Sequence, residues 1–197
     1  MIIGFSVLRF LHILGVVFMA WPLYALISVN ERGRLGAPLG SDADTYMENI
    51  IKGQARRCYI FQLTVGATGL GLLMINGMGL TAILSNWVLT SKTILLIGVI
   101  SLLSYVHLSL QPRIDTLFSG LDSSGQNIPD ETRSKISSLR VRRKRLAGLC
   151  LFLVITLIIL GVQVFEPFNP LLTLVLFVLA AIFAWRAYRG PIKYGWI

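Results

Sequence analysis

The chain has few charged residues, and acids are the scarcer kind. Only 14% of its 197 residues are charged, and nine Asp and Glu stand against 18 Lys and Arg. In an average soluble domain about a quarter of the residues are charged. Hydrophobic residues reach 55%, and the mean hydropathy is +0.73. A single core of this size could not bury so much apolar surface, so the composition excludes an ordinary soluble domain.

Cysteine is also scarce. Cys58 and Cys150 do not form a C-x-x-C or C-x-x-C-H motif, so nothing indicates a disulfide framework, a zinc site or a covalently attached c-type haem. The formal charge of +9 could suggest a nucleic-acid partner. We reject that interpretation, because the basic residues flank long apolar runs, where they are typical of topology signals facing anionic lipid. The lipid bilayer is therefore the first predicted partner, and no nucleic acid is expected.

Five apolar segments approach the length of about 20 residues that a helix needs to cross a bilayer. They cover residues 3–28, 59–75, 88–110, 146–165 and 171–188. The first is too long for a signal-peptide core and lacks a convincing cleavage site, so it predicts a retained span. The second stays apolar through Gly77, Gly79 and Ile83, which predicts either a longer span or a re-entrant or interfacial piece after it.

Lys and Arg are distributed unevenly between these segments. They are frequent in residues 30–57, in residues 111–145 and in the C-terminal tail, and none occurs in residues 76–87 or 166–170. This alternation predicts an N-terminus outside and a C-terminus in the cytoplasm. The predicted fold is an all-α integral membrane bundle of about five transmembrane helices, forming one domain over residues 1–197. We expect both cysteines to be reduced, because each lies near the cytoplasmic end of a span.

The basic cytoplasmic loop, residues 111–145, is the longest polar piece. Residues 120–127 predict a flexible linker, and Pro129 followed by Asp130 and Glu131 predicts a helix start. The basic run 140–145 then abuts the fourth span. Its usual role is to contact lipid headgroups, and a docking surface for a partner is the alternative.

Few polar residues lie inside the spans. They are Arg9, His12, Gln62, Asn76, Lys92, His107 and Gln163, with no Asp or Glu among them. The missing acids weigh against a cation-coupled transporter and against an intramembrane aspartyl protease. We expect Asn76 to end its span and Lys92 to reach the headgroups. Three glycines of the second span, Gly66, Gly69 and Gly71, predict close helix packing.

His12 and His107 are the only histidines, and both lie in spans. A neutral imidazole is a good haem-iron ligand, and Arg9, on the same face of the helix as His12, could pair with a haem propionate. The alternative is a histidine hydrogen-bonded to a neighbouring helix, with Gln62 the natural partner of His107. In this topology the two histidines differ in depth by on the order of 15 Å, so one shared haem is not favoured. Each could hold its own cofactor, or only one could be a ligand.

Two segments resemble a known family. Residues 8–15 followed by Trp21, and Trp87 and Lys92 leading to Tyr105 and His107, are similar to the first and third helices of small bacterial integral membrane proteins. That family includes the HemJ-type protoporphyrinogen oxidases and the CopD-like proteins. The resemblance implies a multi-pass protein of the bacterial cytoplasmic (inner) membrane that binds haem b, with His12 as the first ligand to carry over and His107 as the second.

The predicted function is that of a haem b-associated membrane protein, either an electron-transfer subunit or a HemJ-like oxidase. Whether it is an enzyme stays open. The alternative is a cofactor-free structural or accessory subunit, packed against other membrane protein subunits of a larger complex. Short outer loops, few polar groups at depth and the glycine patch favour that alternative. A transporter or channel comes third.

Overall fold

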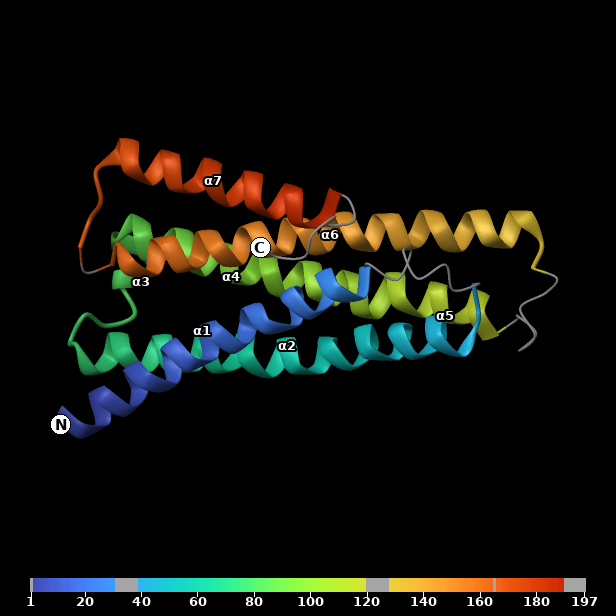
Figure 1. The fold of residues 1–197 in the computed structure, drawn as a ribbon. Helices are drawn as coiled ribbons and strands as arrows, with labels where there is room; N and C mark the ends of the chain where they lie inside the picture. The colour runs from blue at the N-terminus through green and yellow to red at the C-terminus, as the bar shows by residue number, and fades with distance from the viewer. Residues whose placement is uncertain (1, 31–38, 120–127, 165, 190–197) are drawn as a thin grey trace.

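The computed structural model describes residues 2–30, 39–119, 128–164 and 166–189 (Figure 1). Every regular element in these ranges is a helix. In chain order they are α1 (Ile2–Asn30), α2 (Asp42–Ile75), α3 (Ala82–Ser85), α4 (Trp87–Tyr105), the π-helix η2 (Val106–Leu110), α5 (Gln111–Ser119), α6 (Asp130–Val162) and α7 (Pro170–Arg189). The predicted all-α class is confirmed.

Five helical stretches are long and apolar enough to cross a membrane. They are Gly4–Val29, Asp42–Ile75, Trp87–Ser119, Asp130–Val162 and Pro170–Arg189. Each of the five predicted spans lies wholly or mostly within one of these stretches, so the predicted number of spans is confirmed. The fourth ends earlier than predicted, at Val162 rather than at residue 165, and Phe165 lies outside the described residues.

Three of these stretches extend well beyond the apolar segments. α2 has 34 residues and α6 has 33, which makes each about 50 Å long against a hydrocarbon core of about 30 Å. The predicted basic loop 111–145 is therefore mostly helix, formed by α5 and the first part of α6. Its predicted linker, residues 120–127, lies outside the described residues. At one end of the bundle α2, α5 and α6 continue past the ends of α1 and α7 (Figure 1). We call this part, residues 42–52, 111–119 and 130–143, the stalk.

Local capping explains several helix ends. Ser41 accepts a hydrogen bond from the backbone N–H of Asp44 at the start of α2, and Asn86 caps α4 by accepting from Val88 and Leu89. Asn76 ends α2, as expected. The next two turn glycines, at positions 77 and 79, have φ of 69° and 67°, and the short helix α3 then forms before α4. Of the two predictions for this region, a separate piece after the second span is the one observed.

The third span does not end at its proline. Pro112 has no N–H, and its ring would clash with the carbonyl of Leu108, so regular α-helical hydrogen bonding is disturbed at this point. The chain adopts the wider π turn of η2 directly before it, and then resumes as α5. As a result helical structure is continuous from Trp87 to Ser119, and the span is connected to the stalk without a loop.

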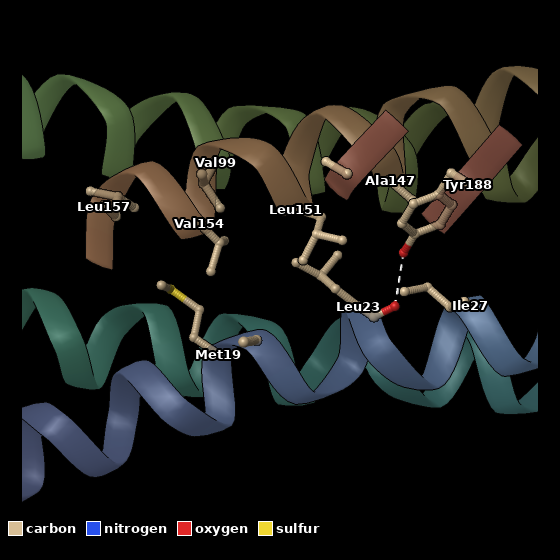
Figure 2. Close-up of a cluster of buried hydrophobic side chains, with 11 residues drawn as sticks. Met19, Leu23, Ile27, Val99, Ala147, Leu151, Val154, Leu157 and Tyr188 are labelled. Atoms are coloured by element: carbon tan, nitrogen blue, oxygen red, sulfur yellow. Dashed lines mark hydrogen bonds between the residues drawn. The ribbon is translucent and has the colours of Figure 1, made fainter. Parts of the chain in front are cut away.

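The core lies where α1 meets α6. Met19, Leu23 and Ile27 of α1 face Leu151 and Val154 of α6, with Val99 of α4 beside them, as Figure 2 shows. The Tyr188 hydroxyl from α7 donates to the Leu23 backbone carbonyl at 2.8 Å, which satisfies a phenol buried among apolar groups. Large apolar side chains elsewhere on the bundle remain exposed, as expected for surfaces that contact lipid.

Close approach of α1 to α2 depends on glycine. A Cβ atom on Gly15 would lie 3.0 Å from Cγ2 of Val65, and one on Gly71 would lie 3.2 Å from Cδ1 of Leu8. Gly69 lies similarly close to the His12 ring. The predicted packing role is confirmed for Gly69 and Gly71, and the helix that packs on them is α1 of this chain. Gly66 faces Leu96 of α4 instead, where a Cβ would lie at an ordinary contact distance of 3.6 Å.

We predict that Gly15→Leu separates α1 from α2 and lowers the free energy of unfolding by about 1–3 kcal/mol, because added carbons in a packed contact force side chains and backbone apart. Unfolding by SDS titration in mixed micelles measures this change. The matched control is Gly98→Leu, at a helical glycine with open space around it. Equal losses in both variants would show that the added side chain itself, and not the α1–α2 contact, is responsible, since leucine raises the helix propensity at both positions.

Candidate functional site

His12 of α1 contacts α2 through a hydrogen bond that sets its tautomer. Its Nδ1 lies 3.0 Å from Oγ1 of Thr68, and that hydroxyl donates its own proton to the Thr64 carbonyl at 2.6 Å. Thr68 must therefore accept at this contact, and Nδ1–H of His12 donates. The Val65 backbone carbonyl is a further hydrogen-bond partner of the His12 ring. With Nδ1 as the donor to Thr68, the neutral imidazole keeps its lone pair on Nε2.

Glycine makes room for the His12 ring on the α2 side. A Cβ on Gly69 would lie 3.3 Å from the His12 Cε1 atom, so glycine leaves room for the ring. Arg9 lies one turn earlier on α1 and is exposed. His12 is only partly buried, so its ring lies at the margin of the bundle. A planar ligand could reach it from the membrane.

His107 occupies a different setting. It lies in the π segment, and its ring meets the Tyr59 ring edge-on with centroids 6.1 Å apart. The Tyr59 hydroxyl donates to Ser104 at 2.9 Å. The hydrogen bond expected between His107 and Gln62 is absent: Gln62 is 2% exposed, and its Oε1 has no partner in the described part of the chain.

The two histidines are not brought together. His12 contacts α2 at Thr68, whereas His107 contacts it at Tyr59, nine residues earlier. At 1.5 Å per residue these positions lie about 13.5 Å apart along α2. This separation agrees with the difference in depth expected from the topology. His12 and Arg9 therefore form one candidate site, and His107 a separate one.

Lys92 is the one lysine predicted inside a span. Its Nζ lies beside Gly161 in the last turn of α6, where a Cβ would be 3.6 Å away. It is partly buried, and it forms no ion pair with any residue that the structure describes. The ammonium thus packs against α6 near the end of the bundle that carries α3, and it interacts electrostatically with His12. That Lys92 reaches the headgroups stays a prediction.

The stalk contains a buried charge network that sequence reasoning missed. Asp44 and Glu48 of α2, Gln111 at the start of α5, and Arg143 of α6 are all at most 6% exposed. Arg143 donates to both carboxylate oxygens of Glu48, at 3.1 Å for the Nη2–Oε2 pair, and also to Oε1 of Gln111 at 2.6 Å. Gln111 in turn donates to Glu48 at 3.0 Å.

Arg140 and the α5 residue Asp115 extend this network. Arg140 donates to Asp44 at 2.8 Å and to Glu48 at 3.3 Å, and its guanidinium lies 4.8 Å from the ring centroid of Phe118. Asp115 pairs with Lys52 of α2 at 2.8 Å. Two arginines thus balance two buried acids, and the bonds connect all three stalk helices.

This arrangement corrects the interpretation of the basic run 140–145 as a uniform lipid-facing patch. Arg140 and Arg143 turn inward to the acids of α2, and Arg142 lies over the Tyr105 ring at 5.4 Å. The spacing of these residues in the sequence does indicate that they could pair. Asp44 and Glu48 are four residues apart, and Arg140 and Arg143 are three apart, so each pair shares one helical face.

Comparison with known proteins adds nothing to the assignment. Protein-family models, curated proteins and solved structures gave no match to this chain. Within the described ranges no group of three or more His, Cys, Asp or Glu side chains could hold a metal ion. Haem iron takes only one or two protein ligands, so this absence says nothing about haem binding at His12.

We predict that Glu48→Ala lowers the free energy of unfolding by about 3–5 kcal/mol, because it leaves Arg143 buried without its counter-charge. Thermal unfolding in detergent measures the effect. The double variant Glu48→Leu/Arg143→Met should recover most of the loss, since it removes both charges. The control Glu131→Ala breaks an exposed pair with Lys135 and should change little. A Glu48→Ala protein as stable as this control would contradict the assigned role of the network.

Proposed function

We propose that this chain is a haem b-associated protein of the bacterial cytoplasmic membrane, with the stalk in the cytoplasm, and that it acts as an electron-transfer subunit or a HemJ-like oxidase. The observation that carries the proposal is the tautomer of His12. Its Nδ1–H is held by Thr68 at 3.0 Å, which leaves Nε2 available as a ligand. Ligating histidines commonly donate their other ring N–H to a protein acceptor that orients the ring.

The space around His12 supports the proposal. Gly69 presents no side chain to the ring, and the partial exposure of His12 leaves one side of it open. When bound, the haem would supply one-electron redox chemistry. In this proposal His12 binds the iron, Thr68 orients the imidazole, and Arg9 pairs with a propionate. Because His107 lies about 13.5 Å away along α2, it would serve a separate site.

The test is a dithionite-reduced minus oxidised absorption spectrum of protein purified from haem-replete cells. We predict a sharp α-band typical of b-type haem, and loss of the part contributed by the His12 site in His12→Ala. His107→Ala is the matched control, and it should keep the band of the His12 site. Thr68→Val removes the acceptor of Nδ1–H, so it should weaken haem retention without abolishing it. A wild-type protein without the band contradicts the proposal.

A second candidate is a cofactor-free accessory subunit of a larger membrane complex, and the exposure of α7 favours it. Of the 20 residues in α7, only Ala180, Ala184 and Tyr188 are buried, and its large aliphatic side chains are exposed on several sides. Such a helix fits either lipid or a neighbouring subunit. A colourless protein that co-purifies with partner subunits in mild detergent would support this candidate over the haem protein.

A further inference from the structure

The stalk has an open groove between α5 and α6. It is lined by Arg113, Thr116 and Leu117 from α5 and by Lys135, Ser138 and Leu139 from α6. The groove lies apart from the His12 site, and the proposed haem function does not use it. Two cationic and two hydroxyl side chains on a shallow apolar floor are suited to an anionic group with several oxygens, such as phosphate.

The charge balance of the stalk leaves a net positive charge at this groove. Asp44 and Glu48 are paired with arginines of α6, and Asp115 is paired with Lys52. Lys135 forms an exposed pair with Glu131 at 2.6 Å. Arg113, by contrast, is exposed and makes no ion pair within the described ranges. Its guanidinium is therefore the cation of the groove that has no acidic partner.

The hydroxyl groups of Thr116 and Ser138 differ in whether they can donate a hydrogen bond to a ligand. Thr116 donates its proton to the Pro112 carbonyl at 2.9 Å, so it would act as a donor to a ligand only after rotating. Ser138 makes no hydrogen bond within the described part of the chain, so its proton can be donated to a ligand. A phosphate in the groove would thus be held mainly by Arg113, Lys135 and Ser138.

The Arg113 end of the groove is its end closer to the apolar part of the third span. Arg113 is five residues past Leu108, which is 71% exposed, and this spacing is about 7.5 Å along the helix. The headgroup layer of a bilayer is about 5–8 Å thick on each side of the hydrocarbon. Arg142 over the Tyr105 ring marks the same boundary from α6. Towards the hydrocarbon, exposed Ile94, Ile97 and Leu108 of the same helical stretch offer a surface for acyl chains.

From these observations we infer that the α5–α6 groove binds the phosphate of an anionic phospholipid whose chains lie along α4. A free phosphate ion would use the same polar groups but would gain nothing from the apolar face. The lipid assignment therefore requires that the polar groups of the groove and the apolar face of α4 both contribute to binding.

Native mass spectrometry of delipidated protein, titrated with phosphatidylglycerol or phosphatidylcholine, tests this inference. We expect preferential binding of phosphatidylglycerol, weakened at least fivefold in Arg113→Gln/Lys135→Gln. The matched control is Arg56→Gln/Arg57→Gln, which removes the same charge from exposed positions of α2 outside the groove and should keep binding within twofold. Thermal unfolding of each variant confirms that it is folded.

Three results would overturn the inference. Equal losses in both double variants would show diffuse attraction to basic residues instead of a site. Displacement of phosphatidylglycerol by low-millimolar inorganic phosphate would assign the groove to a soluble phosphate. Equal binding of phosphatidylglycerol and phosphatidylcholine by the wild type would remove any role for the net negative charge of the headgroup.

Discussion

The absence of hydrogen-bonding solvent in the hydrocarbon is the constraint on which this structure depends. Helices satisfy the backbone, and some of the few polar side chains within the spans find partners on neighbouring helices, although Oε1 of Gln62 and Nε2 of Gln163 do not. Tyr188 donates to the Leu23 carbonyl, and His12 donates to Thr68. Every acidic residue that the structure describes lies outside the five apolar segments. The charges that stabilise the protein are thus collected in the stalk, where water lies near enough to solvate what the ion pairs leave open.

Continuity of the helices connects the two regions. α2 and α6 pass from the bundle into the stalk without interruption, and the third span does so through the π turn before Pro112. The Arg143–Glu48–Gln111 network fixes these three helices relative to one another at one end. The glycine contacts of α1 with α2 fix the bundle near His12. Positioning of His12 therefore depends on close backbone approach, whereas positioning of the stalk depends on charge.

Hydropathy and local helix signals were enough to predict the main features of the fold. Span number, the helix boundaries at Asn76 and Pro129, and the packing role of two of the three glycines all depend on local patterns, and all are observed. Contacts between helices were harder to predict. Arg143 finds Glu48 across 95 residues of sequence, and Gln62 does not bond His107, because helix rotation decides which side chains meet. The separation of His12 and His107 along the bundle needed only the predicted span bounds, their directions and the rise per residue, so it could be predicted.

Cysteine accessibility across the membrane tests the central claim, a five-span bundle with its stalk in the cytoplasm. Single cysteines replace exposed Ser85, Ser101 or Ser134 in a protein whose Cys58 and Cys150 are changed to Ala. A membrane-impermeant maleimide should label Ser85→Cys only in intact cells and Ser134→Cys only in inverted vesicles, and it should leave Ser101→Cys unlabelled. Labelling of Ser85→Cys and Ser134→Cys from the same side would contradict the account.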